Sequence, residues 1–246
     1  VSLTIDPSGV PHIAISDDSG GGDMYYATKV DGDWSNTEIS THDGSLLHDP
    51  IAVSIEVDND GNLYIVAQVQ DGTNDGSADI DVLAFTCTAA EYNSTQCLGT
   101  SGSDWELEEA PFDANDELGY GTMSNSLDTD VALDGTIHVT YTTNESNTGI
   151  SGDFSGHVMV VQLDSGGFGT PVNTSALAHV PGGSGLDLEG AVRGNSSLAL
   201  DLGLDGSIHI AYLGSPDGIH YLSCSSACDS PGSWTSEDIT ESVDIT

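Results

Sequence analysis

The sequence predicts an all-β fold built from four repeated units of four antiparallel strands, and three observations predict it. Short apolar runs alternate with turns rich in Gly, Asp, Asn and Ser, without the sustained 3.6-residue period of a long helix. One strand–turn–strand pattern recurs four times along the 246 residues. Some strands, such as "SIHIAY" at 207–212, are apolar at most positions, which is typical of sheets covered on both faces.

Each repeat opens with Ser, an apolar strand, an Asp-containing turn that ends in Gly, and a second strand. The copies are "SLTIDPSGVPHIAIS" from Ser2, "SIEVDNDGNLYIVAQ" from Ser54, "SLDTDVALDGTIHVTY" from Ser126 and "SLALDLGLDGSIHIAY" from Ser197. The turn glycines are Gly9, Gly61, Gly135 and Gly206, and three residues after them stand His12, Tyr64, His138 and His209. We expect the three histidines to be structural, because each falls inside a strand at one repeat position.

Two more strands complete each unit. The third strands are "DMYYATKV", "DIDVLAFTC", "HVMVVQLD" and "GIHYLSC", and the fourth strands begin near Trp34, Trp105, Phe168 and Trp234. A four-stranded unit repeated along a chain predicts a β-propeller, since one unit cannot cover its own faces but stacked units cover each other. We expect one domain, 1–246, with blades at about 1–46, 47–118, 119–190 and 191–246. Closure of these four blades into a ring is the first expectation, and part of a larger ring is the alternative.

The repeats resemble the S-x-x-x-D-x-x-G-x-x-H-[IV]-A-Y … G-x-W blades of bacterial secreted β-propeller repeat proteins, a loose group that includes sialidase-like and lectin-like propellers. The resemblance covers nearly the whole chain and implies a fold rather than one activity. Such propellers include glycan-binding modules, glycosidases and surface proteins. The strict sialidase box Ser-x-Asp-x-Gly-x-x-Trp is absent, and a chain with one Arg has no arginine triad, which counts against sialidase chemistry.

The charge is strongly negative, with 40 Asp and Glu against Lys29 and Arg193, a net −38. Such a surface repels nucleic acid and anionic lipid, and no apolar run is long enough for membrane insertion. Self-repulsion would be relieved by salt or divalent cations. A salt-rich or calcium-rich setting and acidity kept only for solubility both remain open.

Two local cysteine pairs, Cys87 with Cys97 and Cys224 with Cys228, lack the second half of a zinc ribbon. We expect disulfides, which indicate an oxidising, extracytoplasmic compartment and a secreted or cell-surface protein. Thiol pairs in a cytosolic protein are the alternative. The start at Val1 without Met suggests a processed product.

Calcium is the first cofactor expected from the loops. Alternating oxygen donors around Gly turns suit a hard cation, and they occur in two sets: Asp71, Asp75 and Asp79, and Asp113, Asn115 and Glu117. The alternative is ordinary turn chemistry, in which such side chains bond to their own backbone.

A small-molecule site is expected at the propeller axis, on the face formed by the longest loops, because loops from all blades converge there. The candidate ligand-binding residues are Arg193, Glu189, His48, His157 and His220. Arg193 would clamp an acidic group, with an internal salt bridge as the alternative. Converging histidines would hold a transition metal or supply a general base.

These observations favour a secreted binding module that presents a loop face to a glycan or other small polar ligand. One alternative is a propeller-type enzyme, a glycan hydrolase or a metal-dependent hydrolase or lyase with an axial site. Another is a structural surface protein that contacts further copies of itself. The sequence leaves open whether the protein is an enzyme, which ligand or metal it binds, and its oligomeric state.

Overall fold

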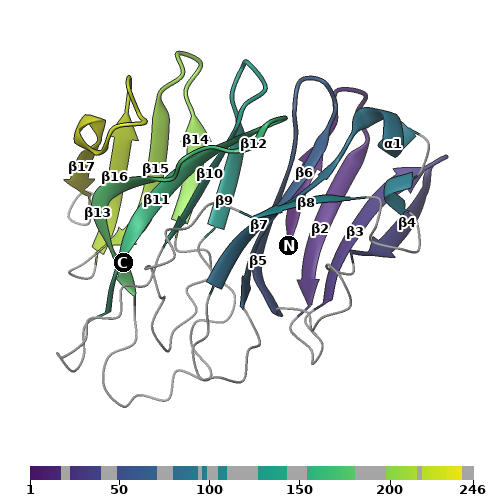
Figure 1. Ribbon diagram of the computed structural model, residues 1–246, viewed down its shortest axis with the longest axis horizontal. Helices are drawn as coiled ribbons and strands as arrows, with labels where there is room; N and C mark the ends of the chain where they lie inside the picture. The colour runs from purple at the N-terminus through teal and green to yellow at the C-terminus, as the bar shows by residue number, and fades with distance from the viewer. Residues whose placement is uncertain are drawn as a thin grey trace.

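A computed structural model of the chain describes residues 1–17, 23–39, 49–70, 80–93, 96–98, 105–109, 127–142, 154–180, 198–214 and 218–239. The all-β prediction is confirmed (Figure 1). In this part of the chain the helical segments are short: α1 (Ala89–Asn93) and two 3-10 turns, Gln96–Leu98 and Pro231–Ser233. No helix within these ranges is long and apolar enough to cross a membrane.

The strands form four antiparallel blades, as the repeats predict, and one paired position, Ala178 with Gly214, joins the sheets of the last two blades. Blade 1 holds β1 (Ser2–Ile5), β2 (Pro11–Asp17), β3 (Asp23–Val30) and β4 (Asp33–Glu38), and blade 2 holds β5 (Asp49–Val57), β6 (Leu63–Gln70), β7 (Ile80–Cys87) and β8 (Glu106–Glu109). Blade 3 holds β9 (Leu127–Val131), β10 (Ile137–Thr142), β11 (Phe154–Asp164) and β13 (Val172–Val180), with the two-residue β12 (Gly167–Phe168) paired to β11. Blade 4 holds β14 (Leu198–Leu202), β15 (Ile208–Gly214), β16 (Gly218–Cys224) and β17 (Thr235–Asp238). The predicted blade boundaries fall in segments outside the described residues.

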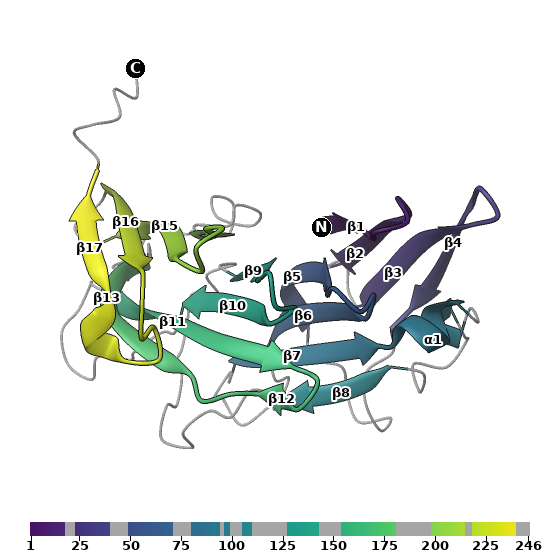
Figure 2. The same ribbon diagram turned by 90° about the horizontal axis from the view of Figure 1, so that it is seen from above.

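The blades are arranged as an arc around their innermost strands. Strands β1, β5, β9 and β14 lie next to one another in chain order, and the other strands of each blade extend outward (Figure 2). Blades 1 and 4 stand apart at the two ends of the arc. The expected closure of the four blades into a ring is therefore not seen among the described residues.

Each blade has two faces, which we name by direction along the chain. The leading face is turned toward the preceding blade, and the trailing face is turned toward the next blade. Apolar side chains fill all three junctions, in one cluster between blades 1 and 2, one between blades 2 and 3, and one between blades 3 and 4. The strands carry apolar side chains on both faces because a blade inside the arc packs against a neighbouring blade on each side.

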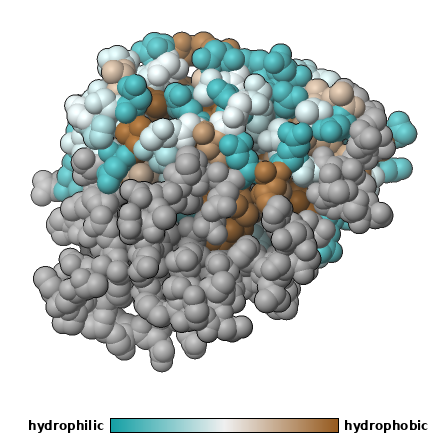
Figure 3. All heavy atoms as spheres, in the orientation of Figure 1, coloured by the Kyte–Doolittle hydropathy of each residue, from teal (hydrophilic) through white to brown (hydrophobic). Residues whose placement is uncertain are grey.

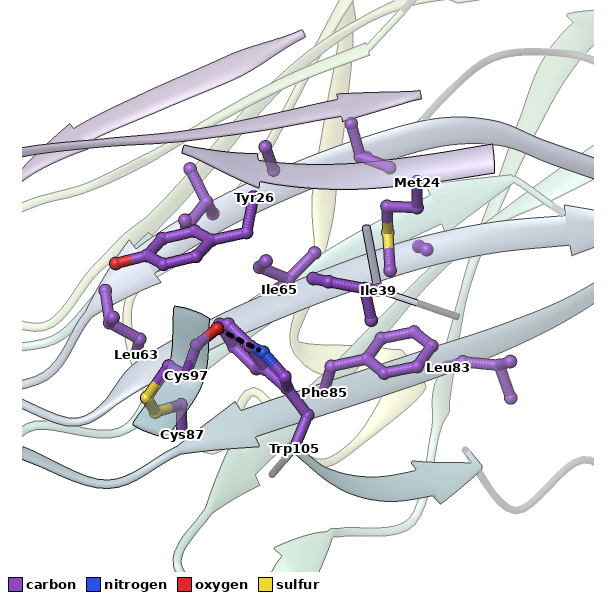
Figure 4. Packing of buried hydrophobic residues seen from close by; sticks show 14 of the residues in the cluster. Met24, Tyr26, Ile39, Leu63, Ile65, Leu83, Phe85, Cys87, Cys97 and Trp105 are labelled. Carbon is purple, nitrogen blue, oxygen red and sulfur yellow. Dashed lines mark hydrogen bonds between the residues drawn. A yellow bond between two sulfur atoms is a disulfide. The ribbon is translucent and has the colours of Figure 1, made fainter. Parts of the chain in front are cut away.

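The junction between blades 1 and 2 shows how the trailing and leading faces fit together (Figure 4). Met24 and Tyr26 from blade 1 point toward Ile65 and Phe85 of blade 2, and all four side chains are buried. The ring of Tyr26 meets Trp105 edge-on, with centroids 5.2 Å apart. The trailing face thus supplies Met24, Tyr26 and smaller apolar side chains to a leading face of aliphatic and aromatic residues.

The two predicted disulfides are confirmed, Cys87–Cys97 in blade 2 and Cys224–Cys228 in blade 4. Both lie between the third and fourth strands of their blades. In each blade the Trp that follows donates its indole N–H to the carbonyl of the second cysteine: Trp105 to Cys97 and Trp234 to Cys228, both at 3.2 Å. The disulfide and the Trp of the repeat therefore form one local unit that fixes the outer edge of the blade.

The Asp of each hairpin turn has a structural role. In blade 2, Asp58 accepts hydrogen bonds from the backbone N–H of Asn62 at 2.8 Å and from the hydroxyl of Tyr64 at 3.1 Å. Gly61 has φ +84°, a conformation that favours glycine, and the other three turn glycines also have positive φ. In blade 1, His12 takes the place of Tyr64 and lies 3.6 Å from the carboxylate of Asp6. In blades 1 and 2 the Asp three residues before the Gly thus closes the hairpin and lies next to the ring three residues beyond the Gly. In blades 3 and 4 the turn Asp, Asp134 or Asp205, directly precedes the Gly and accepts a hydrogen bond from the backbone N–H two residues further on.

Charged side chains lie on the outside of every blade, including Asp33, Glu106, Asp164 and Glu237. The side of the molecule seen in Figure 3 is mainly hydrophilic in its upper part, with apolar side chains in small patches. The acidic excess is therefore spread over the surface rather than confined to one blade.

Candidate functional site: polar side chains on the innermost strands

Polar side chains occupy seven of the eight places at two positions of the innermost strands, seven and five residues before the turn Gly, and Ala199 is the exception. The pairs are Ser2 and Thr4 in β1, Ser54 and Glu56 in β5, Asp128 and Asp130 in β9, and Ala199 and Asp201 in β14. Because side chains alternate along a strand, both positions point the same way, toward the next innermost strand of the arc. The intervening positions carry mostly apolar side chains that face the preceding blade.

These side chains bond to the next innermost strand. Asp128 accepts a hydrogen bond from the backbone N–H of Leu200, and Asp130 accepts one from that of Leu202, both at 2.8 Å. Ser2 accepts one from the N–H of Ile55 at 3.2 Å. An innermost strand has one edge without a strand partner, and an unpaired backbone group is costly where water is excluded. The polar side chains therefore satisfy the inner edges of the blades.

Glu56 differs from these capping groups. Its carboxyl accepts a hydrogen bond from the hydroxyl of Thr4 at 3.4 Å. Burial raises the pKa of Glu56 to about 8, and the negative charges of Asp130 and Asp128 add to the rise. Glu56 is therefore protonated at neutral pH, and it stands beside two other carboxyl groups where blades 2 and 3 meet.

The neighbouring carboxyl groups are held in place by the backbone. Burial raises the pKa of Asp128, while hydrogen bonds from the N–H groups of Leu200 and Thr129 oppose that rise. Thr129 also donates its hydroxyl to Ser54 at 2.7 Å. The result is a fixed row of oxygen atoms on the axial side of the arc, with one neutral acid that can donate a proton or a hydrogen bond.

The structure places few of the residues predicted to bind a ligand. Arg193, Glu189 and His48 lie outside the described residues, and His157 lies in β11 with its side chain not described. His220 lies in β16, on the leading face of blade 4, with its ring 5.4 Å from that of Tyr212. Its Nε2 is buried without a hydrogen-bond partner among the described residues. The predicted convergence of these five residues stays a prediction.

All six residues predicted to bind calcium also fall outside the described ranges: Asp71, Asp75, Asp79, Asp113, Asn115 and Glu117. Within the described ranges no group of three or more His, Cys, Asp or Glu is arranged to hold a metal ion. Calcium therefore stays a prediction for the loops.

Sequence reasoning missed Glu56, Asp128 and Asp130. The signal was one acid between apolar neighbours in "SIEVD" and two acids at alternate positions in "SLDTDV", both in innermost strands. Glu56 precedes the Asp58 turn by two residues, so this row lies toward the ends of the strands that carry the Asp-x-x-Gly turns. The loops predicted to bind a ligand join the opposite ends of the strands.

The chain matches no protein-family model and no curated protein in sequence. A thermostable family-43 glycoside hydrolase is similar in structure over 96% of this chain and 70% of its own, with TM-score 0.52 and 15% identity. The fold is that of a β-propeller. The intramolecular trans-sialidase from Ruminococcus gnavus matches over 87% of this chain and 38% of its own, with TM-score 0.40 and 15% identity. An endo-1,4-beta-xylanase from Bacteroides thetaiotaomicron matches over 92% and 68%, with TM-score 0.36 and 15% identity.

Proposed function

We propose that this β-propeller is a secreted glycan-binding module that holds its ligand at the axial polar row. The observation that carries the proposal is the row of carboxyl groups of Glu56, Asp128 and Asp130 on the innermost strands of blades 2 and 3, where burial raises the pKa of Glu56 to about 8. A protonated carboxyl both donates and accepts hydrogen bonds, and ionised carboxylates accept them. Sugar hydroxyls, which also donate and accept, are matched by that combination.

The secreted location is supported by the two disulfides, since such bonds persist in oxidising compartments. The shared fold with a family-43 glycoside hydrolase agrees with a carbohydrate ligand but does not specify one. The five residues that the sequence predicts to bind a ligand belong to the proposal as a second contact region: Arg193, Glu189, His48, His157 and His220. Calcium in the two Asp-rich loops would stabilise that region.

The test is a glycan array probed with the purified protein, once with calcium and once with a chelator. We expect binding to a defined group of glycans, and a loss of binding in Glu56→Ala, which removes both the donor and the acceptor, whereas Glu56→Gln keeps both and should still bind. Glu106→Ala is the matched control, because Glu106 is an exposed carboxyl in the outermost strand of blade 2. If no glycan binds, or if Glu56→Ala binds as well as the control, the axial row is not the ligand site.

Glycan hydrolysis is a second candidate, favoured by the raised pKa of Glu56. A carboxyl that stays protonated at neutral pH is suited to protonate a leaving-group oxygen while a neighbouring carboxylate activates water or attacks. A panel of chromogenic aryl glycosides tests this role. Activity that falls above about pH 8 in the wild type and vanishes in Glu56→Gln would support hydrolysis. Binding on the array without turnover of any glycoside would instead support a module that only binds glycans.

A further inference from the structure

The leading face of blade 1 is uncovered, although its residues match those of buried leading faces. Leu3 and Ile5 of β1 are 58% and 62% exposed. At the position of Leu3, counted from the turn Gly, blade 2 has Ile55 and blade 4 has Leu200, which are 0% and 9% exposed. An apolar residue that is buried in two blades is thus open to water in blade 1.

This face continues across the whole blade. The strand register places Leu3 beside Ile13, and Ile13 beside Ala27. Toward the outer edge, the exposed ring of Trp34 lies beneath the ammonium of Lys29, with 5.5 Å between Nζ and the ring centroid. Lys29 is one of only two basic residues in the chain. The face is therefore an apolar sheet surface with one positive charge at its rim.

The trailing face of blade 4, at the other end of the arc, is also uncovered. It presents the small side chains Ala199 and Ala211, which are exposed, and the rings of His209 and Tyr221. The two rings stack with centroids 5.8 Å apart, and His209 Nδ1 is hydrogen-bonded to the hydroxyl of Tyr221.

Blade 1 repeats this arrangement on its own trailing face. His12 and Tyr26 stack with centroids 6.0 Å apart, His12 Nδ1 is 2.8 Å from the Tyr26 hydroxyl, and Ala14 is the cross-strand partner of Tyr26. There the group is fully buried against the leading face of blade 2. The trailing face of blade 4 thus carries the same His–Ala–Tyr group that already packs, inside this molecule, on an aliphatic leading face.

The innermost strands repeat the same complementarity. Asp130 of β9 accepts the backbone N–H of Leu202 in β14. Asp201 holds the position of Asp130 in blade 4 and is exposed, and Ile5 holds the position of Leu202 in blade 1. Asp201 on one end of the arc is therefore matched to the backbone N–H of Ile5 on the other.

We propose that a second copy of this chain docks head to tail, with the trailing face of blade 4 in one copy packed on the leading face of blade 1 in the other. This contact would repeat the packing of the three internal junctions, and Lys29 at the outer edge of one face would meet Glu237 at the outer edge of the other. The contact is heterologous, so each copy keeps one further face for growth or ring closure. The net charge of −38 opposes association, which therefore strengthens with salt.

The test is molar mass by light scattering after size exclusion, over a range of protein concentration and salt. We expect the wild type to exceed the 25.3 kDa monomer and to grow with both variables. Leu3→Glu and Ala211→Glu each remove one of the two faces at an exposed position, so each variant alone stays a monomer. Their equimolar mixture retains one intact pair of faces and gives a species of about twice the monomer mass that grows no further.

Gln162→Glu adds the same charge at an exposed strand position of blade 3 and should associate like the wild type. Circular dichroism is used to check that each variant folds. If Leu3→Glu unfolds, Ile5→Glu takes its place, and if Ala211→Glu unfolds, Ala199→Glu takes its place. A wild type that remains monomeric at the highest concentration and salt overturns the proposal. So does a mixture that gives no heterodimer, or single variants that associate as the wild type does. Glycan binding is measured in a separate experiment, so the outcome for association does not decide whether the proposed function is correct.

Discussion

The leading faces of blades 1 and 4 carry leucine at the same repeat position, but Leu3 is exposed and Leu200 is buried. Leu200 packs in the cluster that joins blades 3 and 4, together with Val158 and Val160 of blade 3. Leu3 has no blade before it in the described arc. Each repeat therefore forms an apolar leading face, and that face is buried only where a preceding blade packs on it.

The trailing faces of blades 1 and 4 also differ in burial. The stacked His12 and Tyr26 are buried against blade 2, whereas His209 and Tyr221 remain partly exposed. Burial lowers the pKa of His12, even though the charge of Asp6 opposes this. The hydrogen bond between the His and Tyr side chains therefore forms with and without a covering blade, so it depends on contacts within one blade.

The largest expected effect comes from truncating the two leucines. Leu200→Ala removes a buried side chain and leaves a cavity, so we expect a loss of about 3 kcal/mol in the free energy of unfolding. Leu3→Ala removes the same atoms from an exposed position and should cost below about 1 kcal/mol. Urea denaturation at low protein concentration and low salt, where copies do not associate, measures both. Equal losses would mean that Leu3 is covered in the monomer.

A pH-dependent effect is expected at the junction of blades 2 and 3, through the protonation of Glu56. Its pKa is about 8 in the folded protein, against 4.5 for an unperturbed glutamate. The folded state thus binds more protons than the unfolded state between these pH values, and stability falls as pH rises from about 4.5 to 8. Glu56→Gln should abolish this fall, so its advantage in stability over the wild type should grow as the pH rises from about 4.5 to 8. Thermal melting from pH 5 to pH 9 measures it, and parallel curves for the two proteins would contradict the assignment.

The smallest effect separates two aspartates at one repeat position. Asp130→Ala deprives the N–H of Leu202 of its acceptor and should cost about 1 kcal/mol, whereas Asp201→Ala, at the open end, should cost nearly nothing. Both variants are measured at pH 6, where folded Glu56 is neutral and its repulsion from Asp130 is absent. A substantial loss in monomeric Asp201→Ala would indicate that its carboxylate already caps another strand.

Much of the scaffold could be predicted from the sequence, because the determinants are local. The Asp-x-x-Gly turns, the alternation of side chains and the cysteine spacing act within a single blade, and the predicted strands and disulfides are confirmed. The hydrogen bonds of Trp105 and Trp234 give a physical reason for the aromatic residue in that part of the repeat.

The open ends and the axial acids could not be predicted in this way, because they depend on contacts between blades. Leu3 and Leu200 stand at the same position of the repeat, and Leu200 alone is buried because the preceding blade packs against it. Glu56 is one of 40 acids, and its raised pKa comes from burial and from acids of another blade. The predicted loop site and calcium site lie outside the described residues and stay predictions.

Amide hydrogen exchange, followed by NMR on dilute monomeric protein, tests the central claim that the arc is open while its internal edges are capped. The backbone N–H groups of Ile55, Leu200 and Leu202 are bonded to side chains of the preceding innermost strand and should exchange slowly. Those of Leu3 and Ile5, at the equivalent positions of β1, should exchange orders of magnitude faster and slow down only when association is promoted. Strong protection of Leu3 and Ile5 in the dilute monomer would contradict the account, because a covering strand would then already be in place.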